Sequence, residues 1–282
     1  MTISVIEPHG FCAGVTAALK KALSLAATRR DDSNPSLYCL HELVHNEIVV
    51  DELKKRGFAF VESLADVPNG ATVLFSAHGV APQIREAAQS RGICVVDATC
   101  PFVERVHKAA REFAAKGLRI VVIGHPEHIE VKGIVGEVEE AVVISNVASA
   151  REFCAATADT DASLGVVSQT TMNADEVADI VAVLKTRFKV ETTAEVCNAT
   201  KLRQDAVKAF GGDAVLVLGS ASSSNTARLC ECAPCRAFRA GTMDEVKALD
   251  LSGVTQLGVT SGASTPEEFL KAAVAWLRGE RT

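Results

Sequence analysis

The feature that most constrains the fold is a pattern that occurs three times: a short apolar run, a cysteine, and an amphipathic segment. The cysteines of this pattern are Cys12, Cys100 and Cys197, which lie 88 and 97 residues apart in a chain of 282 residues. Both intervals are close to one third of the chain, which is typical of a long-period repeat. In each copy the apolar run predicts a buried strand, and the segment after the cysteine predicts a helix.

Each third of the chain also contains two further predicted strands that end in polar residues. These six segments occupy residues 37–46, 72–79, 119–125, 164–171, 214–225 and 256–264. Strands that alternate with helices predict parallel βαβ units. Ligands bind at the carboxyl ends of such strands, so the polar residues there are candidate site residues.

The repeat predicts an α/β fold of three similar small parallel-sheet domains in a pseudo-threefold arrangement around a central site. We expect the first domain at 14–97, the second at 98–195, and the third at 196–282 together with 1–13. Each unit of about 90 residues is small for independent stability, so shared buried faces between the domains are expected.

Composition narrows the classes of function. The chain has 29 Lys and Arg against 35 Asp and Glu, and this net charge of −6 predicts no nucleic-acid partner. No apolar run approaches the roughly 18 residues that a membrane helix needs, so no membrane association is expected. The first ten residues resemble no secretory signal, which favours a cytoplasmic location.

The nine cysteines fit poorly with a disulfide framework, because nine is odd and a reducing cytosol disfavours disulfides. Most of them are expected to be small buried residues.

Cys12, Cys100 and Cys197 could instead bind zinc or an iron–sulfur cluster. Zinc sites usually contain close cysteine pairs, which these three lack, whereas a cubane cluster tolerates dispersed ligands. Three cysteine ligands would leave one iron open to a substrate oxygen.

The polar strand ends carry neutral hydrogen-bond donors together with histidines, which suit a phosphate or diphosphate group. The candidate residues are His41, His78, His128, Thr170, Thr171, Ser223, Ser224, Asn225 and Ser264. Helix capping is the alternative role for the Ser, Thr and Asn side chains. The absence of a P-loop or G-x-G-x-x-G sequence disfavours a nucleotide. Glu127 and Glu130 compete as a proton donor to a leaving hydroxyl.

Eight motifs in consistent order resemble 4-hydroxy-3-methylbut-2-enyl diphosphate reductases, the LytB-type iron–sulfur enzymes that complete the non-mevalonate isoprenoid pathway. The motifs are HGFCAGV at 9–15, LHELVHN at 40–46, SAHGV at 76–80, DATCPFV at 97–103, SQTT at 168–171, CNATKLRQ at 197–204, SSSNT at 222–226 and GVTSGAST at 258–265. Together they extend over most of the chain, which makes the resemblance specific.

The resemblance implies a 4Fe-4S cluster with three cysteine ligands, Cys12, Cys100 and Cys197, whose fourth iron takes the C4 hydroxyl of the substrate. It implies reductive dehydroxylation of the allylic diphosphate to isopentenyl and dimethylallyl diphosphate, with ferredoxin or flavodoxin as the external electron donor. Glu130 would relay protons with help from Thr170. The diphosphate would be bound by His41, His78, His128, Ser223, Ser224, Asn225 and Ser264.

The sequence departs from the family pattern in two places. Ile129 stands where the family has proline between its histidine and glutamate, whereas a literal His-Pro-Glu occurs at 125–127. The register that selects Glu130 keeps more family positions than the one that selects Glu127. The second departure is the sequence CECAPC at 230–235, where three core cysteines are favoured over a second metal or redox site.

Two alternative functions stay open at this stage. One is a divergent paralogue that uses the same cluster on another substrate or as a redox sensor. The other is a non-redox protein that binds a phosphorylated ligand, with structural zinc at CECAPC. Iron and acid-labile sulfide analysis separates the cluster proteins from the non-redox protein.

Overall fold

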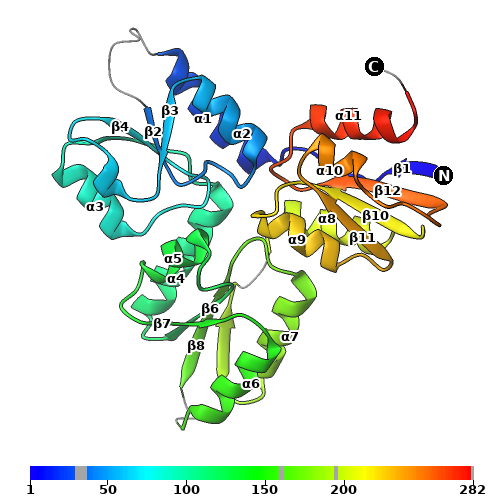
Figure 1. Cartoon of the computed structure of the whole chain (residues 1–282). Coiled ribbons are helices and arrows are strands. Elements are labelled where there is room, and N and C mark those ends of the chain that lie inside the picture. The colour runs from blue at the N-terminus through cyan, green and yellow to red at the C-terminus, as the bar shows by residue number, and fades with distance from the viewer. Residues whose placement is uncertain (29–36, 159–161, 194–195, 281–282) are drawn as a thin grey trace. The chain divides into compact units, whose positions relative to one another are not determined.

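The computed structural model describes residues 1–28, 37–158, 162–193 and 196–280 and contains three parallel four-stranded sheets (Figure 1). Helices follow the strands throughout, which confirms the predicted α/β class. The chain divides into two compact units: Met1–Thr16 with Val44–Lys55 and Asn198–Thr282, and Ala17–Leu43 with Arg56–Cys197. The three-domain boundaries expected from the repeat stay a prediction.

The first sheet has the strand order β3-β2-β4-β5, and all its pairings are parallel. Its strands are β2 (Leu37–Leu40), β3 (Phe58–Val61), β4 (Thr72–Phe75) and β5 (Cys94–Asp97). The helices along this part of the chain are α1 (Ala13–Ala27), α2 (Glu47–Lys55), the short 3-10 helix η1 (Leu64–Asp66) and α3 (Pro82–Ser90). Pro82 begins α3, where a missing backbone N–H costs nothing.

The second sheet repeats this order as β7-β6-β8-β9. Its strands are β6 (Arg119–Ile123), β7 (Ala141–Ile144), β8 (Ser163–Ser168) and β9 (Lys189–Thr192). Its helices are α4 (Pro101–Ala115), α5 (Ile129–Val135), α6 (Val147–Ala156) and α7 (Ala174–Lys185). The strand predicted just before Cys197 forms β9, although positions 194 and 195 lie outside the described residues.

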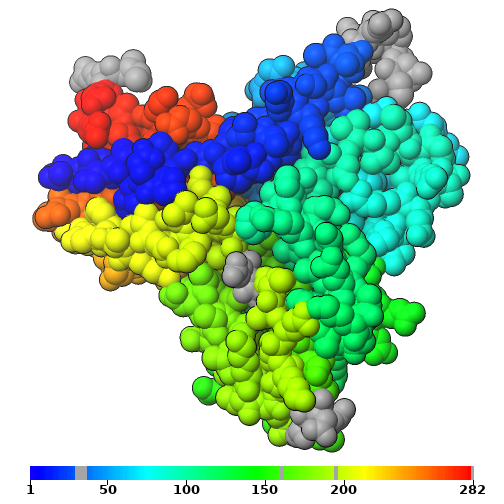
Figure 2. Space-filling view, turned by 180° about the vertical axis from the view of Figure 1, so that it is seen from behind, coloured from blue at the N-terminus to red at the C-terminus, as the bar shows by residue number. Residues whose placement is uncertain are grey.

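The third sheet has the order β1-β12-β10-β11 and takes its last strand from the N-terminus. Its strands are β10 (Ala214–Leu218), β11 (Arg236–Ala240), β12 (Gln256–Ser261) and β1 (Thr2–Val5). Its helices are α8 (Asn198–Lys208), α9 (Ser224–Glu231), α10 (Met243–Lys247) and α11 (Glu267–Leu277). Figure 2 shows the dark blue N-terminal segment alongside the yellow and orange C-terminal third, as the pairing of β1 with β12 requires.

All three sheets therefore have the same topology. When the strands of a sheet are numbered along the chain, with β1 counted as the fourth strand of the third sheet, the first and third strands are neighbours at the centre. The second and fourth strands lie at the two edges. In the third sheet β1 occupies the place that β5 and β9 occupy in the others. The first, third and fourth strands of each sheet were predicted from the sequence, whereas the second strands, β3, β7 and β11, were not.

The central strands are buried on both faces, as expected for parallel sheets covered by helices. Along β10, Ala214, Leu216 and Leu218 pack into one apolar cluster, whereas Val215 and Val217 pack into another. The same alternation divides β6 between two clusters. Successive side chains of a strand point to opposite faces, so each central strand packs against apolar residues on both faces of its sheet. This packing holds the strands in place and supports the loops at their carboxyl ends.

Candidate active site

The polar loops identified in the sequence follow the two central strands of each sheet. His41 follows β2, His78 follows β4, Glu130 follows β6, Thr170 follows β8, Ser223 follows β10 and Ser264 follows β12. In this topology the chain leaves the central strands in opposite directions, and the crevice between them is the usual ligand site. The structure thus gives each polar loop the position at which α/β sheets bind ligands.

The three repeat cysteines follow the fourth strand of each sheet and are held in the same way. The backbone N–H of each donates to the carbonyl two residues beyond the end of the third strand. The pairs are Cys12 with Ala263 at 3.1 Å, Cys100 with Ala77 at 3.0 Å, and Cys197 with Thr170 at 3.1 Å. The topology therefore fixes each cysteine beside a polar loop of its own sheet, which a strand prediction alone does not show.

Each repeat cysteine is a half-buried thiol at the start of a helix. Cys100 is the N-cap of α4, and Cys12 and Cys197 directly precede α1 and α8. The Cys12 sulfur accepts a hydrogen bond from Val15 N at 3.4 Å. Backbone N–H groups at a helix start stabilise negative charge, so these positions suit anionic ligands of a metal group.

The thiols of Cys12, Cys100 and Cys197 have the chemistry of iron–sulfur ligands. Within the described residues, no three His, Cys, Asp or Glu side chains lie together as ligands for one ion. A cubane binds each thiolate to a different iron, so its ligands can come from dispersed positions.

The cysteines of CECAPC form no such group of metal ligands among the described residues, so the structure gives no support for zinc there. Burial raises the pKa of Cys230 to about 11, and Cys230, Cys232 and Cys235 pack against the core beneath β10.

Glu130 is the most perturbed carboxyl group near the polar loops. It is 2% exposed in the first turn of α5, and its two carboxyl oxygens accept from Thr170 N at 2.6 Å and Thr170 Oγ1 at 3.1 Å. Burial raises the pKa of Glu130 to about 7, against the lowering effect of the Thr170 hydrogen bonds. A carboxyl group of this kind can hold a proton at neutral pH and release it to a substrate.

Glu127 has a different environment, although it belongs to the literal His-Pro-Glu sequence. Its side chain is 90% exposed and pairs with Lys132 at 2.9 Å. An exposed ion pair of this kind has the properties of an ordinary surface charge. The geometry therefore favours the register in which Glu130, with Ile129 before it, occupies the family's glutamate position.

Three histidines line the polar loops of the same unit. His128 is the N-cap of α5, and its Nδ1 accepts from Glu130 N at 3.2 Å. Its ring meets the His78 ring edge to face, with centroids 5.8 Å apart. His41 contacts Glu62 through Nδ1 at 2.8 Å and has a left-handed backbone with φ of 60°. His41 is the one described residue other than glycine with positive φ, and such strain is typical of functional sites.

The other unit contributes a second group of predicted residues. Ser223 is the N-cap of α9 and accepts from Thr226 N at 3.3 Å, while the Ser264 hydroxyl donates to the His45 carbonyl at 3.1 Å. Asn225 is 5% exposed, and among the described residues neither its amide nitrogen nor its amide oxygen has a hydrogen-bond partner. A buried amide without a partner is costly unless a ligand satisfies it, so this position suits the oxygens of a diphosphate.

Two residues that support the loops of the candidate site, Gln169 and Asp97, were not predicted from the sequence. Gln169, inside the SQTT motif, is fully buried and accepts from His125 N at 3.1 Å while its Nε2 donates to Thr171 Oγ1 at 2.9 Å. It thereby ties the loop after β6 to the loop after β8. The only signal in the sequence was its place directly before the assigned Thr170, because an isolated Gln carries no periodicity that predicts burial.

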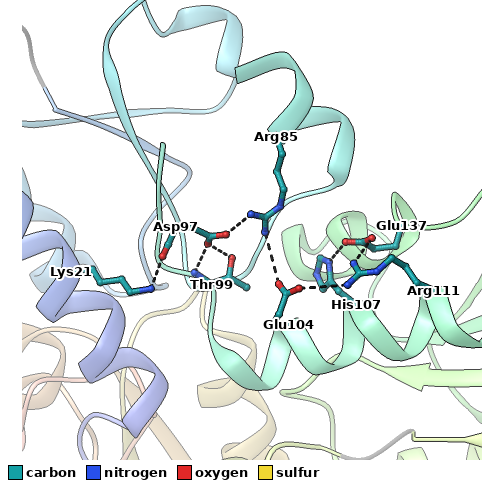
Figure 3. Close-up of polar contacts among 8 residues, drawn as sticks. All are labelled: Lys21, Arg85, Asp97, Thr99, Glu104, His107, Arg111 and Glu137. Carbon is teal, nitrogen blue, oxygen red and sulfur yellow. Dashed lines mark hydrogen bonds and ion pairs between the residues drawn. The ribbon is translucent and has the colours of Figure 1, made fainter. Parts of the chain in front are cut away.

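Asp97 is the second supporting residue and lies at the end of β5, just before Cys100 (Figure 3). Its carboxylate accepts from Thr99 N at 2.8 Å and Thr99 Oγ1 at 2.5 Å, and it pairs with Arg85. Lys21 Nζ donates to the Asp97 carbonyl at 2.6 Å. Burial raises the pKa of Asp97, but the Thr99 and Arg85 contacts outweigh it and hold the pKa below its ordinary value. An ionised Asp97 therefore fixes the turn that leads to Cys100.

Comparison with known proteins decides the family. The family model described as "LytB protein" matches residues 3–278. The chain belongs to the LytB family. It is 39% identical to the 4-hydroxy-3-methylbut-2-enyl diphosphate reductase of Neisseria meningitidis serogroup C, over 99% of this chain and 87% of that protein. It is 38% identical to the reductase of Acidithiobacillus ferrooxidans, over 99% of this chain and 89% of that protein.

Solved structures agree with this assignment. The chain matches the E-1-hydroxy-2-methyl-but-2-enyl-4-diphosphate reductase of Plasmodium falciparum with a TM-score of 0.90 and 34% identity, over 98% of this chain and 87% of that chain. A second reductase, described as the terminal enzyme of the non-mevalonate pathway, matches with a TM-score of 0.67 and 29% identity, over 99% of this chain and all of that one. LytB-family reductases are iron–sulfur enzymes, so this family assignment confirms the predicted class of cofactor.

No helix in the described part of the chain is both long enough and apolar enough to span a bilayer.

Proposed function

We propose that this LytB-family protein is a 4-hydroxy-3-methylbut-2-enyl diphosphate reductase that forms isopentenyl and dimethylallyl diphosphate. Its named relatives have this activity, and the match extends over nearly the whole chain. The single observation in the structure that carries the proposal is the equivalent hydrogen bond of the three repeat cysteines, each to the loop after a third strand. A fold that holds three thiols in this repeated way is suited to a cluster with three protein ligands.

Cys12, Cys100 and Cys197 would hold the 4Fe-4S cluster in this proposal. When bound, such a cluster would pass the two electrons of the reaction one at a time from the external donor and would supply a Lewis-acidic iron for the departing hydroxyl. The electrons would come from a small external donor of the ferredoxin or flavodoxin type. The cytoplasmic location expected from the sequence belongs to the same proposal.

Glu130 would supply the proton for the departing hydroxyl. Its raised pKa keeps a substantial fraction protonated near neutral pH, and Thr170 holds both carboxyl oxygens in a fixed orientation. A general acid is most effective when its pKa lies near the working pH. Thr171, whose hydroxyl accepts from Gln169, would contact the substrate from the adjacent position.

The diphosphate would be bound by two sets of neutral donors and histidines. One set is His41, His78 and His128, which stand at the ends of central strands in one compact unit. The other is Ser223, Ser224, Asn225 and Ser264 in the second unit. The buried amide of Asn225 supports this role because a phosphate oxygen would satisfy its nitrogen.

The proposal is tested with protein purified under anaerobic conditions. Iron and acid-labile sulfide are measured first, and the diphosphate is then supplied together with a reduced electron donor. We expect both a bound cluster and conversion to the two products. A cluster without turnover would indicate the divergent paralogue or redox sensor, and absence of iron and sulfide in folded protein would refute the cluster proposal altogether.

A further inference from the structure

A buried histidine that was not predicted as a site residue contacts two segments that carry predicted site residues, the loop after β4 and helix α5. His107 lies in the middle of α4 and is fully buried. Its Nδ1 donates to the Glu137 carboxylate at 2.7 Å, and Arg111 Nη1 donates to the other carboxylate oxygen at 2.6 Å. Figure 3 shows His107 and Arg111 reaching Glu137 from the same side of α4. The Glu137 side chain is only 3% exposed, so this is an interior pair.

The ring of His107 packs against two glycines, Gly79 and Gly133, at its Nε2–Cε1 edge. A methyl group on Gly79 would lie 3.1 Å from His107 Nε2, and one on Gly133 would lie 3.2 Å from His107 Cε1. Any other residue at either position would have to push the ring aside. Within the described chain His107 Nε2 has no hydrogen-bond partner, so its contacts there are packing contacts.

The two glycines belong to segments that carry proposed site residues. Gly79 directly follows His78 in the loop after β4, and Gly133 lies three residues beyond Glu130 in α5. Glu137 follows the C-terminal end of α5, while His128 and Glu130 stand at its N-terminal end. Helix α5 also packs on α4 through Val131 and Ile134 in a shared apolar cluster. A short helix moves nearly as a rigid body, so a shift at Gly133 would displace Glu130 as well.

We propose that His107 is a positioning residue, held by Glu137, whose ring edge fixes the positions of the loop after β4 and of helix α5 for catalysis. This inference depends on the proposed function only for its catalytic consequence, because the placement of Glu130 can be measured without turnover. Displacing a reacting group by about 1 Å can cost on the order of a hundredfold in rate.

The test uses His107→Asn, whose amide can still donate to Glu137 but is too short to reach the two glycines. The readout is the pH titration of the protonated Glu130 carboxyl group, followed through its infrared C=O stretch in the anaerobically purified protein and assigned by its loss in Glu130→Gln. Because burial is the main cause of the raised pKa, water admitted by a loosened α5 should lower the midpoint by about one pH unit. We expect kcat to fall by about tenfold to a hundredfold, with KM and iron content nearly unchanged.

Glu104→Gln is the matched control, because Glu104 is on the same helix and pairs with Arg111 at 3.6 Å but is half exposed. It should leave both the infrared midpoint and kcat unchanged. If His107→Asn does not fold, Glu137→Ala, which removes the acceptor that holds Nδ1 and so lets the ring move, should shift the midpoint in the same direction. An unchanged midpoint in a folded His107→Asn variant overturns the inference. Failure of the wild-type protein to reduce the diphosphate would instead count against the proposed function.

Discussion

Glu130 should give the folded protein an unusual dependence of stability on pH. Its pKa rises from 4.5 to about 7 in the folded state because the carboxyl group is buried. At 1.36 kcal/mol per pKa unit, a shift of this size corresponds to about 3 kcal/mol between the two protonation states. This order of magnitude is large against a typical total stability of roughly 5–15 kcal/mol.

The sign follows from proton binding. Between pH 4.5 and about 7 the folded protein retains a proton on Glu130 that the unfolded chain has lost. The stability contributed by this group is therefore fully present below pH 4.5 and is lost as the pH rises through about 7. Most acids in native proteins have lowered pKa values and show the opposite trend.

Glu130→Gln removes this dependence while keeping the shape of the protonated acid. The amide oxygen can accept from Thr170 N as Glu130 does now, and the amide nitrogen can donate to Thr170 Oγ1. The variant should match the wild type below pH 4.5 and exceed it by up to about 3 kcal/mol at about pH 8. In thermal unfolding this is a difference in Tm of several degrees, since about 1 kcal/mol moves Tm by roughly 2–4 °C in proteins near this size.

The assay compares thermal unfolding of anaerobically purified wild type and variant across this pH range, with cluster content checked before each scan. Glu127→Gln is the control, because its carboxylate is 90% exposed beside Lys132, and it should not reproduce the difference expected for Glu130→Gln. In turnover, Glu130→Gln should slow reduction with the cluster retained, and wild-type activity should decline above about pH 7. A Tm difference between wild type and Glu130→Gln that is constant with pH would refute the buried-acid reasoning, and a larger catalytic defect in Glu127→Gln would show that the other register is correct.

Three further predictions concern the cluster, the diphosphate and the core. Cys197→Ser should abolish cluster retention and turnover, and full activity with normal iron content would remove this cysteine from the ligand set. Asn225→Ala should raise KM by roughly tenfold or more through loss of a hydrogen bond to a charged group, without lowering Tm, because the amide has no partner among the described residues. A lowered Tm with an unchanged KM would show that the amide supports the fold instead. Gly165→Ala should destabilise the protein by about 1–3 kcal/mol, because its methyl group would lie 2.5 Å from Phe113 Cβ; an unchanged Tm would show that α4 can shift without cost.

Several structural features were predictable because they depend on local chemistry. The apolar runs before Cys12, Cys100 and Cys197 form β1, β5 and β9, and the amphipathic segments after them form helices α1, α4 and α8. The second strand of each sheet was not identified. These strands, such as β7 (Ala141–Ile144), are short edge strands, and no polar site residue marks their ends.

The choice between two glutamates shows where local information is insufficient. Glu127 and Glu130 lie in one short segment, and motif matching could only rank them. The structure separates them because α5 turns one carboxyl group into the interior toward Thr170 and leaves the other in solvent beside Lys132. The burial of a side chain depends on the segments that pack over it. For Glu130 these include the loop that carries Thr170, which is 40 residues away in the chain.

The sequence by itself determined the class of fold, the threefold recurrence of cysteines and the family, because periodicity and motifs are carried by neighbouring residues. Only the tertiary structure decided that Glu130 is the buried acid and that His107 packs against both Gly79 and Gly133. These features depend on contacts between residues distant in the chain. Their energies come from burial and packing, which arise only when the chain has folded.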